Sequence, residues 1–234
     1  MGRIGMSTVK VSYFSDVLCV WAYVAQARVD ELQRAFGADV HLDYRFCSVF
    51  GDVKAKIGGG WRDRGGFAGY NTHVMGVAER FPEIGVHPEV WLKVQPASSA
   101  SPHLFLAALA DIESGRGLPI SDGGSALFER VALAFRRGFF RDCLDIGRWD
   151  VQCAIAESLG VDIDAIEENL HEGRAFARLS ADYQDADKMR IEGSPTFVLN
   201  EGRQKLYGNV GFRIIEANIK ELLREPSGTQ ASWC

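Results

Sequence analysis

The sequence predicts an α/β fold in which a strand-helix-strand unit and a strand-strand-helix unit, at the two ends of the chain, enclose an all-helical insertion. Three observations lead to this prediction. Short segments that alternate apolar and polar residues, as half-buried strands do, occur only near the two ends. The middle of the chain instead carries apolar residues at helical spacing. The length of 234 residues suits one large domain or a small domain with an insertion.

The N-terminal unit begins with a strand over residues 9–14 (VKVSYF), where polar residues alternate with β-branched and aromatic ones. A Ser-Asp turn follows, and residues 20–36 carry apolar side chains at helical spacing until a glycine ends the helix. Residues 40–46 (VHLDYRF) alternate again. A strand, a helix and a strand within about forty residues form a βαβ unit, which implies a parallel strand pair joined by a right-handed crossover.

The central part of the chain changes character. Residues 51–66 are rich in glycine and predict an irregular connection. The segments beyond them predict helices over residues 67–80, 102–114, 124–139, 148–159 and 163–189. The last of these ranges contains a Glu-Gly pair, so the sequence leaves open whether it forms one helix or two. Because this block has almost no strand-like alternation, it predicts an all-helical insertion.

The β pattern returns after the helical block. Residues 197–199 and 204–207 predict two strands around a turn that holds Asn and Gly, hence a β-hairpin. Residues 211–223 (GFRIIEANIKELL) predict a final amphipathic helix. Joined across the insertion, the order βαβ then ββα is the four-strand layout of a thioredoxin domain.

This layout predicts the domain organisation. Residues 1–58 and 190–226 form a discontinuous thioredoxin-like domain, and residues 59–189 form the helical insertion. Residues 227–234 are expected to form a C-terminal tail.

Composition argues against several kinds of partner. Lys and Arg number 26 against 31 Asp and Glu, a net charge of −5, and without a strong basic cluster we expect no nucleic-acid partner. No run approaches the roughly 20 apolar residues of a membrane span, so we expect no membrane partner. Neither cysteines nor histidines show metal-ligand spacing, so we expect no metal site and no tightly bound cofactor.

The cysteine content and the first residues predict a compartment. Residues 1–10 show neither the apolar segment nor the cleavage pattern of a secretory signal. The 5 cysteines are widely spread and odd in number, which does not make a disulfide framework and fits a reducing compartment. We therefore expect a cytoplasmic protein.

Cys19 lies where the first predicted strand ends and the first predicted helix begins. A free cysteine has a pKa of about 8.5 and is mostly protonated at neutral pH. The unpaired N–H groups at a helix N-terminus favour an anion, and cysteines so placed can have pKa values of about 3.5–7.5. The position therefore predicts a nucleophilic thiol with a lowered pKa. From position alone, a small buried hydrophobic residue is the open alternative.

A Ser-Pro pair opens the returning strand and marks a second candidate segment, made of Ser194, Pro195 and Thr196. An X-Pro bond at such a place is a candidate cis peptide, although most X-Pro bonds are trans and many Ser-Pro pairs are only turns. In a thioredoxin domain the corresponding loop packs beside the catalytic sulfur and leaves backbone groups free to pair with an extended thiol substrate. These three residues are therefore predicted to bind substrate next to Cys19.

Residues 15–23 (SDVLCVWAY) resemble the active-site segment of the DsbA-like family, in which cysteine, proline, an aromatic residue and cysteine follow a short acidic turn. Residues 192–198 (EGSPTFV) are similar to that family's cis-proline loop, and residues 139–146 and 156–160 resemble parts of its helical insertion. The likeness covers nearly the whole chain and extends to the kappa-class glutathione transferases and the 2-hydroxychromene-2-carboxylate isomerases. It implies a thioredoxin fold with a helical insertion.

The departures from the family's motif restrict the reactions that Cys19 can carry out. In the active-site motif, Val20 stands in place of the family's proline, Trp21 is the aromatic residue, and Ala22 replaces the second cysteine. A dithiol oxidase stores its disulfide between two sulfurs, so Cys19 can form a mixed disulfide but cannot resolve it within the motif. The transferase and isomerase relatives carry serine in place of Cys19. They also carry an acidic residue near the start of the last helix, and residues 207–212 contain no carboxylate here.

Three further residues are candidates for the site. Cys47 follows the second strand, at the sheet edge where ligands gather, and Cys234 is the last residue, so either thiol is a candidate to resolve a disulfide on Cys19. The alternatives are a small packing residue for Cys47 and a frayed terminus for Cys234. His103 begins a helix and is a candidate acid or base, with a surface or capping role as the alternative.

These features lead to three functional hypotheses. The first is a monothiol thiol-disulfide oxidoreductase that works through Cys19 and exchanges disulfides with glutathione or a protein thiol. The second keeps the fold and is a glutathione-dependent transferase or isomerase of the kappa or 2-hydroxychromene-2-carboxylate isomerase type. The third is a non-enzymatic redox sensor in which Cys19 forms a regulatory disulfide with Cys47 or Cys234. Glutathione is expected only as a cosubstrate, and because members of the family often dimerise, the resemblance is compatible with a homodimer.

Overall fold

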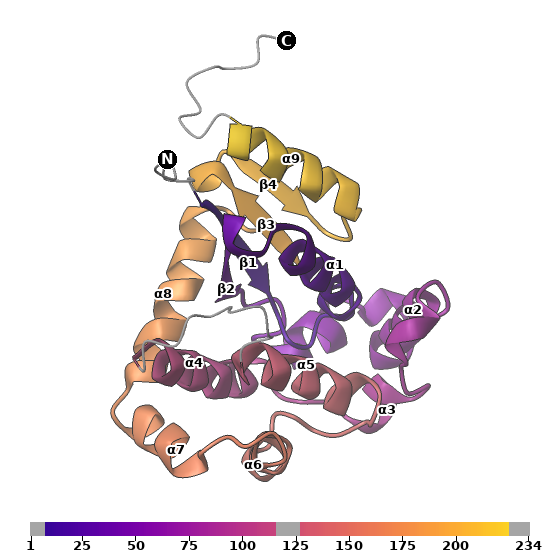
Figure 1. Ribbon diagram of the computed structural model, residues 1–234. Coiled ribbons are helices and arrows are strands. Elements are labelled where there is room, and N and C mark those ends of the chain that lie inside the picture. Colours follow the sequence, from indigo (N-terminus) through magenta and orange to yellow (C-terminus); the bar gives the residue numbers. More distant parts are fainter. Residues whose placement is uncertain (1–7, 116–126, 225–234) are drawn as a thin grey trace.

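The structure is a computed structural model that describes residues 8–115 and 127–224 of the chain. The described residues form a four-stranded sheet with the order β2-β1-β3-β4. The strands are β1 (Val9–Ser15), β2 (Val40–Phe46), β3 (Thr196–Leu199) and β4 (Gln204–Tyr207). β2 runs parallel to β1, β3 antiparallel to β1, and β4 antiparallel to β3. The predicted thioredoxin layout is confirmed (Figure 1).

The α-helices of the described residues lie mostly between β2 and β3, which confirms the helical insertion. They are α1 (Val20–Phe36), α2 (Gly66–Ala78), α3 (Val90–Lys93), α4 (Ala100–Gly115), α5 (Leu127–Phe140), α6 (Trp149–Glu157), α7 (Ile163–His171), α8 (Arg174–Lys188) and α9 (Phe212–Arg224).

Several local expectations need correction or completion. The range 163–189 forms two helices, α7 and α8, which separate at Gly173, where φ is 76°. The glycine-rich connection contains a π-helical turn, Lys54–Gly59, that its composition did not predict. α3 was not predicted, because one turn is too short to show helical periodicity, and the fully buried Trp91 fixes it against the core. The first residues of the predicted helix 124–139 and the predicted tail lie outside the described residues.

Helices cover both faces of the sheet. α1 and α9 pack on one face (Figure 1). The buried side chains of this layer include Val11, Tyr13, Leu32, Ile215 and Ile219. On the opposite face Ala186 of α8 packs with Phe14 and Val198. Because successive residues of a strand point to opposite faces, the neighbours Tyr13 and Phe14 belong to different layers.

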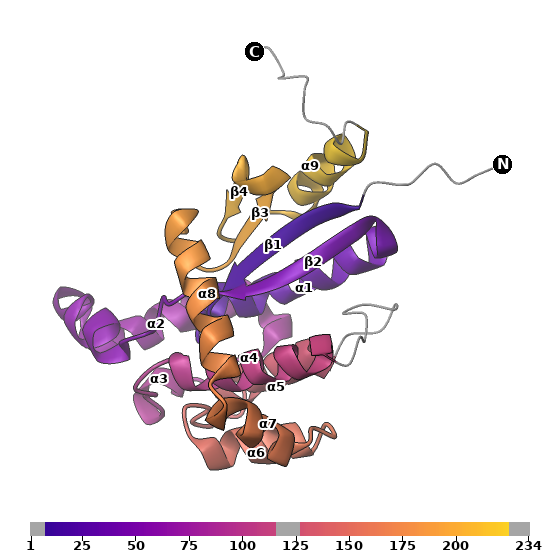
Figure 2. The same cartoon turned by 90° about the vertical axis from the view of Figure 1, so that its left-hand side faces the viewer.

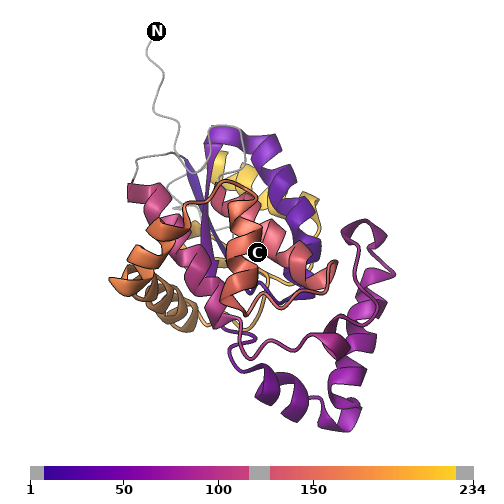
Figure 3. The ribbon, with the colours of Figure 1, turned by 90° about the horizontal axis from the view of Figure 1, so that it is seen from below.

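The insertion helices α2 to α7 lie beside one end of the sheet, mostly below it in Figure 2. Figure 3 looks from that side and shows α2 reaching away from the other helices. One continuous buried cluster joins these helices to the start of α1 and the end of β2; it includes Cys19, Phe46, Trp91 and Phe135. The insertion therefore packs directly on the end of β2 and on the start of α1, where Cys19 lies. Its exact boundaries, residues 59–189, stay a prediction.

The described residues also bear on membranes, metals and disulfides. Within residues 8–115 and 127–224, no helix is long and apolar enough to cross a membrane. No group of three His, Cys, Asp or Glu side chains in this part of the chain is arranged to hold a metal ion. The cysteines described, Cys19, Cys47, Cys143 and Cys153, are all free thiols.

Glu129 of α5 is a buried carboxyl group that makes stability depend on pH. It is 5% exposed, and its Oε1 accepts a hydrogen bond from Gln33 Nε2 at 2.7 Å. Burial raises the pKa of Glu129 from 4.5 to about 7. The folded state therefore binds this proton more tightly than the unfolded state, so stability falls as pH rises from 4.5 towards about 7.

We expect Glu129→Gln to remove this loss. When the pH is raised from about 5 to about 8, wild type should lose about 2–3 kcal/mol more free energy of unfolding than the variant does. Urea unfolding at the two pH values measures the difference, and Glu79→Gln, at an exposed position, is the control. A difference between Glu129→Gln and wild type that does not change with pH would contradict the prediction.

Candidate active site

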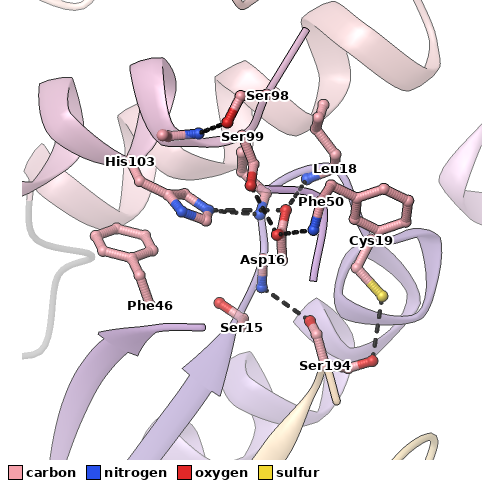
Figure 4. Close-up of polar contacts among 12 residues, drawn as sticks. Ser15, Asp16, Leu18, Cys19, Phe46, Phe50, Ser98, Ser99, His103 and Ser194 are labelled. Atoms are coloured by element: carbon pink, nitrogen blue, oxygen red, sulfur yellow. Dashed lines mark hydrogen bonds and ion pairs between the residues drawn. The ribbon is translucent and has the colours of Figure 1, made fainter. Parts of the chain in front are cut away.

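Cys19 caps the N-terminus of α1 with an extended backbone, at φ −87° and ψ 117°. Its carbonyl oxygen accepts the first helical hydrogen bonds, from the backbone N–H groups of Ala22 and Tyr23, both at 3.1 Å. Its thiol donates a hydrogen bond to the carbonyl oxygen of Ser194, with Sγ 3.1 Å from that oxygen (Figure 4). The residue is 6% exposed. The predicted nucleophile thus lies at a helix start, directly against the loop before β3.

A fully buried carboxylate organises the turn between β1 and α1. Asp16 Oδ1 accepts a hydrogen bond from the backbone N–H of Leu18 at 2.9 Å. Its Oδ2 accepts from the backbone N–H of Phe50 and from the hydroxyl of Ser99, both at 2.8 Å (Figure 4). Asp16 therefore ties the turn to the segment after β2 and to the residue before α4. From the sequence, Asp16 is predicted only to lie in a turn, because its partners Phe50 and Ser99 are 34 and 83 residues away along the chain.

The loop before β3 meets the same turn. The peptide bond between Ser194 and Pro195 is cis. The hydroxyl oxygen of Ser194 accepts a hydrogen bond from the backbone N–H of Asp16 at 2.8 Å. Ser194 thus holds the turn at two points, through its hydroxyl at Asp16 and through its carbonyl at Cys19. The structure brings the predicted nucleophile and the predicted substrate-binding loop together.

The protonation of Cys19 differs from the sequence-based expectation. Burial raises the pKa of the Cys19 thiol above its ordinary value. The backbone N–H of Ala22 and the Ser194 side chain lower the pKa, and the Asp16 carboxylate raises it further. The predicted lowering by the helix N-terminus is wrong for the free protein, because desolvation of a buried thiolate outweighs the favourable N–H groups. Cys19 therefore rests as a protonated thiol at neutral pH.

The other motif residues form the first turn of α1, and Thr196 begins β3. Val20 and Ala22 are buried, and Trp21 is only partly buried. At the family's second cysteine position the structure holds the methyl group of Ala22, which is 0% exposed. Thr196 is also buried, and its hydroxyl donates to the carbonyl of Gly193 at 2.8 Å, which braces the loop before β3.

His103, the candidate acid or base, lies in a buried environment, and its acid-base role stays a prediction. Its side chain is fully buried and stacks on Phe46 with ring centroids 4.4 Å apart. Nε2 accepts the backbone N–H of Val17 at 3.1 Å, so the proton of the neutral ring is assigned to Nδ1, 3.1 Å from Tyr183 Oη. Burial lowers the pKa of His103 to about 4. Both nitrogens of the neutral imidazole are engaged, so His103 helps to hold the turn that carries Asp16 and Val17.

Of the two candidate resolving thiols, the structure describes Cys47 only. Cys47 follows β2, is 3% exposed and packs with Phe14 and Val198, in a cluster separate from the one that holds Cys19. Burial raises the pKa of the Cys47 thiol well above its ordinary value, with the charge of a Cys19 thiolate acting in the same direction. A resolving role for Cys47 stays a prediction. Cys234 lies outside the described residues.

Comparison with known proteins identifies a family whose model matches this chain. The family described as the DSBA-like thioredoxin domain matches residues 10–220, most of the chain. Among curated proteins, none matches the chain significantly.

Solved structures with the same fold cover nearly the whole chain. A protein described as a probable DsbA oxidoreductase from Streptomyces coelicolor is 19% identical, with a TM-score of 0.65 over 97% of this chain and 93% of that one. The cytosolic disulfide reductase DsbM from Pseudomonas aeruginosa is 18% identical, with a TM-score of 0.61 over 92% and 98%, and it has also been solved with GSH. A 2-hydroxychromene-2-carboxylate isomerase is 17% identical, with a TM-score of 0.59 over 95% and 100%. At these identities the likeness shows the fold alone.

Proposed function

The chain belongs to the DSBA-like thioredoxin domain family, and from this premise we propose that it is a thiol-disulfide oxidoreductase that works through a single sulfur, that of Cys19. In the proposed step the Cys19 thiolate attacks one sulfur of a disulfide, a new S–S bond forms on Cys19, and the other sulfur leaves as a thiolate. Cys19 is oxidised, the leaving sulfur is reduced, and the Cys19 proton passes to solvent. A thiol from solution, glutathione or a protein thiol, then attacks the mixed disulfide and returns Cys19 to its reduced state.

The contact between Cys19 Sγ and the carbonyl oxygen of Ser194 supports this proposal most directly. A substrate strand that docks on this loop pairs with its backbone groups, as strands do when they add to an exposed edge. The same docking brings a substrate sulfur next to Cys19. The methyl group of Ala22 offers no second thiol within the motif, so the mixed disulfide waits for a thiol from outside.

Because the pKa of Cys19 is raised, only a small fraction of it is thiolate in the free protein, and this limits the rate of the proposed reaction. In the free protein the Cys19 thiol donates a hydrogen bond to the Ser194 carbonyl, and a hydrogen bond that the protonated form donates favours the thiol over the thiolate. A substrate N–H that pairs with this carbonyl takes the place of that bond. The backbone N–H of Ala22 then remains to stabilise a thiolate at the helix start. Substrate docking and deprotonation of Cys19 are therefore coupled in this proposal.

Ala22→Cys tests the monothiol part of the proposal. After reaction with oxidised glutathione, we expect wild type to keep a glutathione adduct on Cys19, observed by intact mass and peptide mapping. In the variant the introduced thiol lies three residues from Cys19 at the helix start, where side chains are neighbours, so the adduct should be released and an internal disulfide should form. The larger side chain costs about 1–3 kcal/mol of stability at this buried position.

Ala25→Cys is the matched control, because Ala25 is another buried alanine of α1 that lies farther from Cys19 along the helix. Its adduct on Cys19 should persist as in wild type. If wild type itself releases the adduct and forms an internal disulfide, the monothiol mechanism is overturned and Cys47 or Cys234 becomes the resolving thiol.

A second candidate function is a glutathione-dependent isomerase or transferase, and the protonation of Cys19 favours it. A buried thiol that keeps its proton can donate a hydrogen bond to a bound glutathione thiolate. In that reaction Cys19 positions glutathione and is not itself attacked or oxidised. Cys19→Ser distinguishes the two functions, since it should keep turnover in an isomerase and remove disulfide exchange in an oxidoreductase.

The proposal also includes a compartment and partners. We place the reaction in the cytoplasm, supported by the free thiols of the described cysteines and by the fold shared with DsbM, a cytosolic protein. The partners are a thiol-containing small molecule or protein, with glutathione as a cosubstrate rather than a resident cofactor. A homodimer stays a prediction.

A further inference from the structure

We infer that the disulfide substrate of Cys19 carries carboxylates, which bind two arginines beside a pair of aromatic rings next to the active site. The inference rests on the proposed function and specifies the class of its substrate. The feature that carries it, here called the Trp21–Phe81 surface, consists of Trp21, Phe81, Arg28 and Arg80.

The aromatic part of this surface adjoins Cys19. Trp21 lies two residues after Cys19, in the first turn of α1, and it is only partly buried. Its ring meets the ring of Phe81, which follows α2, in an edge-to-face pair with centroids 6.2 Å apart. The pair joins the start of α1 to the end of α2, helices that contact each other. The Trp21–Phe81 surface therefore begins in the same first turn of α1 that Cys19 caps.

Two guanidinium groups lie on the rings. Arg80 is 5.3 Å from the centre of the Trp21 ring, and Arg28 is 5.7 Å from the centre of the Phe81 ring. Arg28 is seven residues after Trp21, about two helical turns, so both belong to the same face of α1. Each arginine donates one hydrogen bond to a backbone carbonyl of the preceding turn, which leaves its other N–H groups for a ligand.

Neither of these two arginines has a carboxylate within 4.0 Å, which is also true of eight other arginines in the described residues. The arginines that do have one are Arg34, Arg45, Arg141, Arg148, Arg174, Arg203 and Arg224. The acidic residues nearest in sequence are Asp30 and Glu31 for Arg28, and Glu79 and Glu83 for Arg80. None of the four pairs with either guanidinium, since Glu31 pairs with Arg34 and Asp30 accepts a hydrogen bond from Gln26. In a protein with a net charge of −5, an uncompensated pair of cations beside the nucleophile favours an anionic ligand.

Carboxylate is the chemistry that this arrangement fits. A guanidinium binds a carboxylate through two parallel N–H···O bonds, and stacking on an aromatic ring holds its plane in place for this. A disulfide whose ends carry carboxylates, as oxidised glutathione or an acidic peptide does, can place one end on Arg28 and Arg80 while its sulfur meets Cys19. The exchange itself is unchanged: the thiolate of Cys19 forms the new S–S bond and the anionic thiol half leaves.

The test compares three disulfides that differ in charge: oxidised glutathione (anionic), bis(2-hydroxyethyl) disulfide (neutral) and cystamine (cationic). The rate of adduct formation on Cys19 is measured by mass spectrometry, and each rate is divided by that of the same disulfide with a small free thiol. In the double variant Arg28→Gln/Arg80→Gln, we expect the glutathione rate to fall about tenfold, as two exposed ion pairs allow. The neutral rate should stay the same, and the cystamine rate should rise.

Arg34→Gln is the control, since Arg34 is an exposed arginine of the same helix that already pairs with Glu31. It should change none of the three rates. Equal slowing of all three disulfides in the double variant, or no slowing of glutathione, would overturn the inference. Failure of wild type to react with any of the three is a different result, because it removes the proposed function itself.

Discussion

Cys19→Ser is expected to reduce the formation of a mixed disulfide with oxidised glutathione at this site to background. The substitution removes the sulfur that lies 3.1 Å from the Ser194 carbonyl and replaces it with a hydroxyl that can still donate to that carbonyl. The free energy of unfolding should therefore stay within about 1 kcal/mol of wild type. Intact mass and peptide mapping after reaction with oxidised glutathione measure the loss.

Cys153→Ser is the control for this experiment, because Cys153 is a partly exposed thiol of α6, outside the active-site segment. That variant should form the Cys19 adduct at the wild-type rate. If Cys19→Ser instead keeps full catalytic turnover with glutathione and a small electrophilic or aromatic substrate, the isomerase or transferase function replaces the oxidoreductase proposal.

Asp16→Asn is expected to have two large effects: it should lower the stability of the protein and raise the reactivity of Cys19. The carboxylate is 0% exposed and accepts three hydrogen bonds, so an amide that presents N–H groups to some of these donors should lower the free energy of unfolding by about 2–4 kcal/mol. The negative charge of Asp16 also raises the pKa of Cys19. Its removal should therefore lower the pKa of the thiol and speed alkylation at neutral pH, although the protein is less stable.

The measurements are urea unfolding and the pH dependence of Cys19 alkylation by iodoacetamide, followed by mass spectrometry. Asp63→Asn, at an exposed position, is the control and should change neither quantity. Ser99→Ala is a milder variant, which removes one donor to the Asp16 carboxylate and should cost about 1 kcal/mol. An unchanged or raised Cys19 pKa in Asp16→Asn would show that the carboxylate does not control the thiol.

The fold could be predicted from sequence because its signals are local. Alternation over residues 9–14 and 40–46, and helical spacing over residues 20–36, depend on one face of each element being buried, which the sequence shows directly. The order of the elements then leaves few topologies, and the right-handed crossover rule selects the parallel pair β1 and β2. The single-turn helix α3 and the π-helical turn Lys54–Gly59 escape this reasoning.

The candidate site could be predicted only in part. Cys19 and Ser194 are visible because each stands at a boundary between two predicted elements, at a helix start and before a strand. The protonation of Cys19 was predicted wrongly, since the helix start is a local feature whereas burial depends on how the insertion packs. Asp16 and His103 form the support of the site with partners that are distant in sequence, and no local pattern marks such partners.

The monothiol mechanism is tested most directly by a time course of intact mass for wild type mixed with oxidised glutathione, at a pH above the pKa of Cys19. Peptide mapping should show a glutathione adduct on Cys19 that persists until a reducing thiol is added and is never replaced by a disulfide to Cys19, whatever the partly exposed thiols of the described chain do. A protein that gains no adduct at Cys19, or that converts it to a disulfide between Cys19 and another of its own cysteines, would rule out the monothiol mechanism.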